Sequence, residues 1–359
     1  MDRSNKHIAK SLLFMPPDVA APRYDRENPL CMQTVLFFFT GGTISMKHDA
    51  ARGGAVPALS GAEILSHDPE LANLANIEVV DFARLAGPQI TPGHMWDLST
   101  QINAALERPE VAGAVVTHGT DTLEETAFFL DLRHRSAKPV VVIGAMRNAS
   151  ELSYDGPANV RAAMRVVIDE SSRGQGVFVL LNETIHAAAY ATKMDTQAIE
   201  TFQSPVFGPL GIVDKDRVFF ARTLKFRQTI DTARMEDRVD LFQMYAGSDG
   251  RFIDFARESG AKGIVIEGTG RGNVPPMTLP AIQRAIDAGL PVLISTRCAQ
   301  GRVLDTYAYE GSGRDLRKRG AIFAGNLTGP KARILLMLAL GITSDPQELR
   351  RLVEAGQYF

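Results

Sequence analysis

The sequence predicts an α/β protein with a larger N-terminal domain built on a parallel β-sheet and a smaller C-terminal α/β domain. At 359 residues the chain is too long for one ordinary hydrophobic core. From Met32 onward, short apolar runs alternate with helical patterns. This alternation stops in a charged stretch after Val213 and resumes at Val239, which divides the chain into two α/β parts.

The first part is predicted to hold five strands separated by helices. The strands are expected at Thr34–Phe39, Ile77–Phe82, Ala112–Thr117, Val140–Gly144 and Gly176–Leu181. A first helix is expected to begin at Ala62–Ser66. Three further helices are expected over Gly93–Leu106, Leu123–Leu132 and Asp155–Asp169. Buried apolar strands that alternate with amphipathic helices are typical of a parallel sheet covered on both faces.

The second part repeats this alternation over a shorter length. Its strands are expected at Val239–Tyr245, Gly263–Glu267, Pro291–Ser295 and near Ile322. Its helices are expected before Gly260 and over Leu279–Ala288, Lys331–Gly341 and Pro346–Ala355. The predicted boundaries are a flexible leader over residues 1–31, the first domain over 32–215, a linker over 216–238 and the second domain over 239–359.

Composition argues against several classes of protein. A net charge of -2 gives no basic surface for nucleic acid, so no nucleic-acid partner is expected. The apolar runs are far shorter than the roughly 20 residues of a membrane span, so no membrane attachment is expected. Cys31 and Cys298 form neither a disulfide framework nor a metal motif. Pro16 and Pro17 interrupt the one apolar patch near the N-terminus, so no signal peptide is predicted and a cytoplasmic location is expected.

The segment Thr40-Gly41-Gly42-Thr43-Ile44 directly follows the first predicted strand. Ligands of open parallel sheets bind at the carboxyl ends of the strands. Two consecutive glycines there let backbone N–H groups approach a ligand, and Thr43 adds a hydroxyl beside them. A nucleophile next to oxyanion-stabilising amides is what acyl transfer requires. The alternative interpretation is a glycine turn with a threonine N-cap; the spacing fits neither a dinucleotide fingerprint nor a P-loop.

A second polar segment, Thr117-His118-Gly119-Thr120-Asp121-Thr122, follows the third predicted strand. Asp121 or Thr122 could simply cap the helix that begins there. Because both segments follow strands of one sheet, however, we expect them to face the same crevice. His118 is more typical of a structural hydrogen-bonding residue and is not assigned to catalysis.

These two segments, together with further motifs in the same order, resemble the bacterial-type L-asparaginase family. The further motifs are Gly144-Ala145-Met146-Arg147, Asp155-Gly156-Pro157 with Asn159, Ala191-Thr192-Lys193, Phe207-Gly208-Pro209-Leu210-Gly211, Gly268–Asn273 and Pro330-Lys331-Ala332-Arg333. The resemblance runs from Thr34 to the C-terminus, about nine-tenths of the 359 residues.

The resemblance implies an amidohydrolase that converts L-asparagine to L-aspartate and ammonia, on a flavodoxin-like N-terminal domain. Thr43 matches the nucleophile. Thr120, Asp121 and Lys193 match a second catalytic group, in which the lysine helps to deprotonate a hydroxyl and the aspartate holds the substrate's α-amino group. Thr120, Asp121 and Gln89 match substrate-binding positions. The resemblance also implies no metal or organic cofactor, a homodimer or homotetramer, and a C-terminal domain that contributes to an intersubunit site.

Three departures from the family pattern bear on substrate choice. Many members carry an activating tyrosine in the loop after the first strand, and no tyrosine occurs between Ser45 and Gly61. Pro88 stands where a recognition serine is common. In the C-terminal domain, Gly247 replaces an asparagine, and Tyr307 or Glu310 stands near the position of the glutamate that a neighbouring subunit donates in the family.

Other functions therefore stay open. The recognition loop is compatible with glutamine, a D-isomer or another small amide as substrate. The amide-hydrolysing subunit of a tRNA-dependent amidotransferase shares the same motifs, but it usually has an additional N-terminal domain, for which about 33 residues before the first strand are too few. A non-enzymatic protein that binds small amides would retain the fold without the activating tyrosine.

Overall fold

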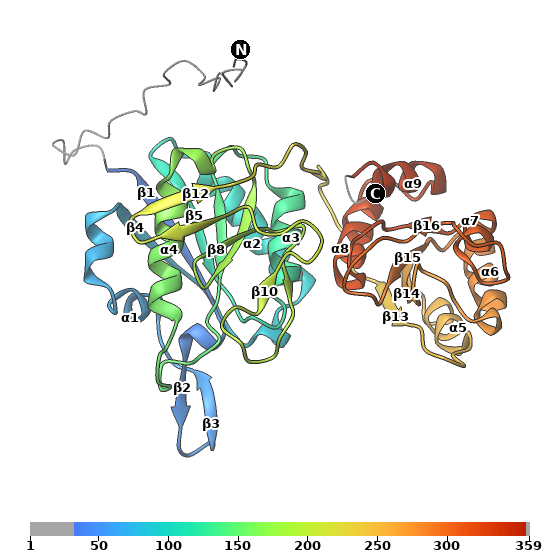
Figure 1. Cartoon of the computed structure of the whole chain (residues 1–359), viewed down its shortest axis with the longest axis horizontal. Coiled ribbons are helices and arrows are strands. Elements are labelled where there is room, and N and C mark those ends of the chain that lie inside the picture. The colour runs from blue at the N-terminus through green and yellow to red at the C-terminus, as the bar shows by residue number, and fades with distance from the viewer. Residues whose placement is uncertain (1–31, 357–359) are drawn as a thin grey trace, which may run out of the picture. The chain divides into compact units, whose positions relative to one another are not determined.

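The computed structural model describes residues 32–356, and the leader expected over residues 1–31 lies outside them (Figure 1). The N-terminal lobe is built on an eight-stranded sheet with the order β12-β11-β8-β7-β6-β5-β1-β4. Its strands are β1 (Thr34–Gly41), β4 (Asn76–Leu85), β5 (Val111–Thr117), β6 (Val140–Ile143), β7 (Val177–Leu181), β8 (Thr184–Ala187), β11 (Gly211–Asp214) and β12 (Arg217–Phe220). The five strands predicted from sequence are thus present.

The strands β4, β1, β5, β6 and β7 are parallel neighbours, in the order 2-1-3-4-5 of a flavodoxin-like sheet. After β1 the chain forms β4 on one side of β1 in the sheet and then β5 on the other side of β1. The ends of β1 and β5 therefore form the switch point, where ligands of such sheets bind. The predicted fold class is confirmed.

Helices cover both faces of this sheet because alternate strand residues point to opposite sides. The helices of the N-terminal lobe are α1 (Gly61–Leu65), α2 (Pro92–Leu106), α3 (Leu123–Arg133) and α4 (Gly156–Ile168). Val35, Phe37 and Phe39 of β1 pack in a core with α1 and α4. Leu36 and Phe38 pack in a second core with α2 and α3.

One edge of the sheet is antiparallel, which the sequence pattern did not predict. β8 pairs with β7 through a turn in which Asn182 and Glu183 both have positive φ, at 48° and 61°. That geometry suits a two-residue hairpin turn, but Asn-Glu lacks the glycine that usually marks one. β11 and β12 continue the antiparallel edge, and β12 lies within residues 216–238, expected as linker. Val218 and Phe220 pack against the core there, so the sheet extends into that stretch.

Two short hairpins complete the lobe. β2 (Met46–Asp49) pairs with β3 (Gly54–Pro57) and projects from the lobe in Figure 1. β9 (Thr192–Lys193) pairs with β10 (Phe202–Gln203).

The C-terminal lobe holds a parallel four-stranded sheet in the order β13-β14-β15-β16. Its strands are β13 (Val239–Gln243), β14 (Gly263–Gly268), β15 (Val292–Thr296) and β16 (Ile322–Phe323). Its helices are α5 (Arg251–Glu258), α6 (Leu279–Asp287), α7 (Gly313–Arg319), α8 (Gly329–Leu340) and α9 (Pro346–Glu354). All were predicted from sequence except α7, whose short and highly charged sequence has little apolar periodicity.

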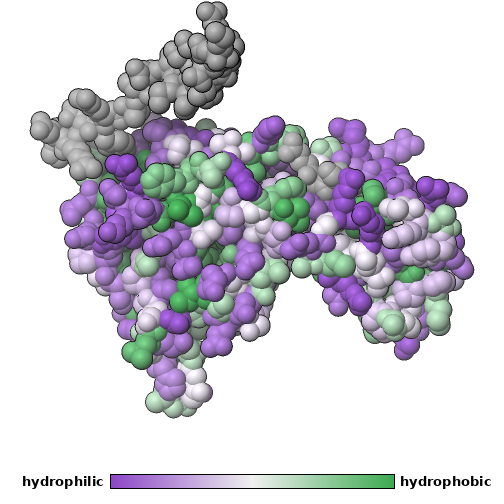
Figure 2. Space-filling model, viewed as in Figure 1, coloured by the Kyte–Doolittle hydropathy of each residue, from purple (hydrophilic) through white to green (hydrophobic). Residues whose placement is uncertain are grey.

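Hydrophilic and hydrophobic residues are interspersed over the face shown in Figure 2. Among residues 32–356, no helix has the length and hydropathy that crossing a membrane would require.

Candidate active site

The turn that carries Thr43 directly follows β1. Gly41 and Gly42 have positive φ values of 112° and 80°, a backbone region that favours glycine. The chain then enters the 3-10 turn η2 (Thr43–Ser45). Thr43 is half-buried, and its hydroxyl makes no hydrogen bond with any other described residue. The side chain is therefore free to act on a ligand.

Three glycines bring three strand ends into backbone contact. A Cβ atom on Gly42 would lie 2.3 Å from the backbone nitrogen of Gly119, and one on Gly119 would lie 2.5 Å from that of Gly87. Only glycine fits at separations this short. The Thr122 hydroxyl also donates to the Gly87 carbonyl at 2.7 Å. The segments after β1, β4 and β5 are thus held together, as expected for the switch point of the sheet.

Thr120, Asp121 and Lys193 meet at the end of β5. Lys193 lies on β9, and its Nζ donates to Thr120 Oγ1 at 2.9 Å and to Asp121 Oδ1 at 2.8 Å. The Lys193 side chain is 18% exposed, whereas that of Asp121 is 60% exposed. The Lys193 backbone N–H donates to Glu124 Oε2 at 2.9 Å, which ties β9 to the first turn of α3. Residues separated by about 70 positions therefore form one hydrogen-bonded cluster.

His118 lies beside this cluster but is fully buried. Its Nδ1 donates to the Gly119 carbonyl at 2.9 Å, because a carbonyl can only accept. Its Nε2 then accepts from the Thr126 hydroxyl at 2.8 Å. Burial lowers the pKa of His118 to about 4, although the bond to Gly119 opposes the shift. A neutral ring with both nitrogens engaged has no free nitrogen for a ligand.

Gln89 ends the short turn η4 (Gly87–Gln89) and is exposed. Its Oε1 accepts the backbone N–H of Ala86 at 2.8 Å. The side-chain oxygen of Gln89, the expected substrate-binding residue, therefore already has a backbone partner. Its side-chain amide nitrogen is left to contact a ligand. Pro88 beside it is also exposed and offers no polar group.

The candidates in the C-terminal lobe make no hydrogen bond with this cluster. Gly247, Tyr307 and Glu310 are exposed, and the Tyr307 ring stacks on Tyr309. The described chain therefore brings together Thr120, Asp121 and Lys193, but not these three residues.

Lys331 is a buried residue for which the sequence motif suggested no role. It lies on α8 and is 1% exposed. Its Nζ donates to the carbonyls of Ala188, Ala189 and Ala191 at 3.0, 3.2 and 2.5 Å. Burial lowers the pKa of Lys331 to about 8. These carbonyls directly precede β9, so Lys331 fixes the segment that leads to Lys193. A lysine within the apolar run of α8 was the available sequence signal.

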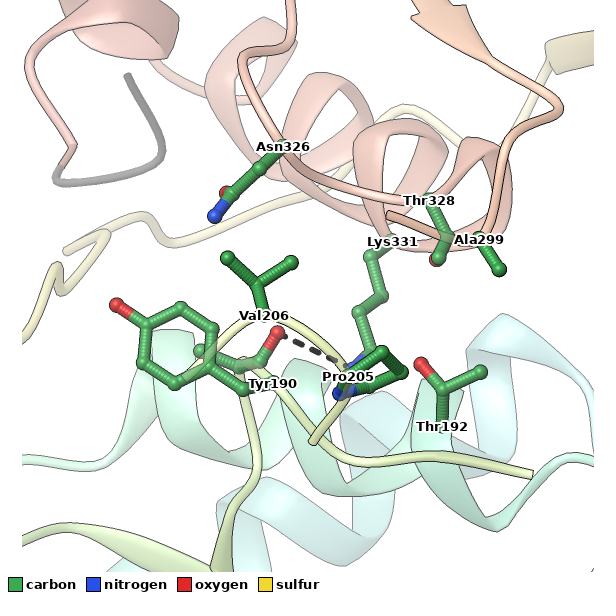
Figure 3. Close-up of a pocket in the computed structure, with 9 residues that line it drawn as sticks. Tyr190, Thr192, Pro205, Val206, Ala299, Asn326, Thr328 and Lys331 are labelled. Carbon is green, nitrogen blue, oxygen red and sulfur yellow. Dashed lines mark hydrogen bonds between the residues drawn. The ribbon is translucent and has the colours of Figure 1, made fainter. Parts of the chain in front are cut away.

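A small cavity of about 20 Å³ lies beside Lys331 (Figure 3). Its lining includes Tyr190, Thr192 and Thr328 but none of the four expected catalytic residues. A volume of that size holds about one water molecule. It is too small for an amino-acid substrate and does not mark the active site.

Comparisons with known proteins converge on one family. The family model described as "Asparaginase, N-terminal" matches residues 34–226, and that described as "Glutaminase/Asparaginase C-terminal domain" matches residues 238–353. An L-asparaginase from Bacillus licheniformis is 37% identical over 306 residues, covering 85% of this chain and 95% of that protein. A probable periplasmic L-asparaginase from Haemophilus influenzae is 34% identical, with 91% and 94% covered. The crystal structure of a probable cytoplasmic L-asparaginase from Campylobacter jejuni matches with a TM-score of 0.80 and 30% identity, covering 90% of this chain and 99% of that one.

Proposed function

Because the chain belongs to the asparaginase family, we propose that it hydrolyses the side-chain amide of L-asparagine to L-aspartate and ammonia, with Thr43 as nucleophile. The observation that carries the proposal is the cluster in which Lys193 Nζ donates to both Thr120 Oγ1 and Asp121 Oδ1. Thr120 and Asp121 of this cluster follow β5, which pairs with β1, and the turn after β1 carries Thr43.

The first half of the reaction forms an acyl-enzyme. The Thr43 oxygen gives up its proton and bonds to the amide carbon, the C–N bond breaks, and the nitrogen takes up that proton and leaves as ammonia. The Gly42 N–H already donates to the Leu85 carbonyl at 2.8 Å, so the N–H of Thr43 is the donor expected to stabilise the negative charge on the substrate oxygen. In the second half, water attacks the ester carbon and gives one proton to the Thr43 oxygen, and the bond to Thr43 breaks to release aspartate.

The Thr120 cluster is suited to proton transfer and substrate placement. Because Lys193 donates to the Thr120 oxygen, the Thr120 O–H remains able to donate to another group. Asp121 uses Oδ1 for Lys193, which leaves Oδ2 for the α-ammonium group of an amino acid. Gln89 would contact the same substrate through its amide nitrogen.

Glutamine is the second candidate substrate. Pro88 supplies no hydroxyl at the recognition loop, and the Gln89 oxygen already has a backbone partner. The C-terminal family is named for glutaminases as well as asparaginases. Comparing the rates at which the protein hydrolyses asparagine and glutamine separates these two candidate substrates. A protein that only binds these amides would hydrolyse neither.

The proposal includes a homodimer or homotetramer in the cytoplasm. Phe252 and Phe255 on α5 are more than half exposed, which favours contact with another chain. The similar structure is named cytoplasmic, whereas the Haemophilus relative is named periplasmic. Sedimentation of the purified protein and fractionation of the producing cells test these two points.

The test is steady-state ammonia release from L- and D-asparagine and L- and D-glutamine. Thr43→Ala is expected to lower kcat by about 10³-fold or more, because loss of a nucleophile removes the covalent route. Thr100→Ala, which changes an exposed threonine on α2, serves as the matched control. Equal ammonia release by the wild type and Thr43→Ala would refute the proposal.

A further inference from the structure

The turn that carries Thr43 has a partner for each backbone carbonyl, and one partner comes from far along the chain. The Gly42 carbonyl accepts the backbone N–H and the hydroxyl of Ser45 at 2.9 and 2.8 Å. The Thr43 carbonyl accepts the N–H three residues later. The Ile44 carbonyl accepts the hydroxyl of Tyr154 at 2.5 Å, across 110 positions. Ile44 is fully buried, so its carbonyl requires such a donor.

Tyr154 is itself held in place by its surroundings. It lies between β6 and α4, and its ring rests on Gly156, where a Cβ atom would lie 2.4 Å from the ring. The His67 ring meets it edge-on, with the centroids 5.8 Å apart. Burial, with a smaller contribution from the Asp155 charge, raises the pKa of Tyr154 above its usual value. The phenol therefore stays protonated and remains a donor at ordinary assay pH.

The same segment also holds the hairpin that follows the turn. The Ala149 N–H donates to the Met46 carbonyl at 3.0 Å. The His48 N–H donates to Ser150 Oγ at 3.0 Å. Together with the bond from Tyr154, three hydrogen bonds join residues 149–154 to residues 44–48. The bond from Tyr154 is the one nearest to Thr43.

We propose that Tyr154 is a positioning residue for Thr43, which it holds from a different loop through the backbone of the turn. The inference rests on the proposed role of Thr43. Tyr154 acts through the Ile44 carbonyl: it fixes the backbone from which the Thr43 hydroxyl projects, and it transfers no proton.

Tyr154→Phe tests the proposal because it removes the hydroxyl and keeps the ring on Gly156. We expect kcat to fall about 10-fold, with KM changed less than about 2-fold, since small displacements of a reacting group reduce the rate of the chemical step. Backbone amides of residues 44–48 should exchange with deuterium faster than in the wild type. The pH profile of kcat should keep its shape, and thermal unfolding should confirm that the variant is folded.

Ser150→Ala is the matched control, since it removes the bond to His48 from the same segment. It is expected to speed exchange at His48 and to leave kcat within about 2-fold of wild type, because an exposed hydrogen bond contributes little. The proposal is overturned if Tyr154→Phe changes neither exchange nor kcat, if Ser150→Ala lowers kcat equally, or if Tyr154→Phe removes a limb of the pH profile. Absence of ammonia release from the wild type would instead refute the proposed function, and the exchange measurement would still report on the bond from Tyr154 to Ile44.

Discussion

The segments that follow β1 and β5 touch through their glycines, yet they hold their threonines in different ways. After β1, hydrogen bonds fix the backbone of the turn, while the Thr43 hydroxyl has no partner in residues 32–356. After β5, the Thr120 hydroxyl is bonded to Lys193, which is also paired with Asp121. The first segment fixes a backbone and leaves a side chain free, whereas the second fixes the side chains themselves.

This difference matches two chemical tasks. A nucleophile has to reach a substrate carbon, so a rigid backbone with a free hydroxyl suits it. A proton-transfer group works through a hydrogen bond that exists before the reaction, so its side chains have to be positioned before the substrate binds. Breaking each segment should therefore have a different signature.

Lys193→Met should have the largest effect of the changes to the segment that follows β5. Methionine keeps the length of the side chain but cannot donate to Thr120 or Asp121. We expect kcat to fall about 10³-fold, within the range usual for general acid–base groups. Ammonia release at saturating asparagine gives the effect, with Lys262→Met, an exposed lysine in the C-terminal lobe, as control. Equal rates for the two variants would show that the Thr120 cluster has no part in catalysis.

Gly119→Ala should disrupt the contact between the segment that follows β5 and the one that follows β4. The added Cβ would meet the Gly87 backbone, which cannot move aside without shifting the end of β4. Overpacking of this kind is expected to cost about 3 kcal/mol of unfolding free energy. Gly54→Ala is the matched control, since its Cβ would meet no atom within 4 Å. Urea denaturation measures both variants, and similar losses would mean that the glycine contact does not constrain the site.

Local patterns predicted the fold more completely than the site. The parallel strands and their helices follow from apolar runs such as those of β1 and β5, which are buried over nearly their whole length. The hairpin at Asn182 was missed because its turn lacks glycine. The Thr120 cluster was expected because of a family resemblance. The contact of Tyr154 with Ile44 joins residues 110 positions apart, and no periodicity in the sequence encodes it.

The smallest effect concerns His118, which distinguishes the β5 segment by its response to acid. The folded pKa is about 4 and the ordinary value is 6.5, so between these values the unfolded chain binds a proton that the folded chain does not. The stability that His118 contributes is full above pH 6.5 and is lost as the pH falls toward 4. Linkage gives a loss of about 2 kcal/mol between pH 7 and pH 5.

His118→Asn removes this titration, so its unfolding free energy should depend less on pH over that interval. His134 and His186 also have pKa values lowered to about 4 by burial and titrate in the same window. All three histidines therefore contribute to the pH dependence of the wild-type unfolding free energy. The variant should lose only the contribution of His118. Denaturant unfolding at pH 7, 6 and 5 measures the slopes, and parallel lines for wild type and variant would contradict the assignment.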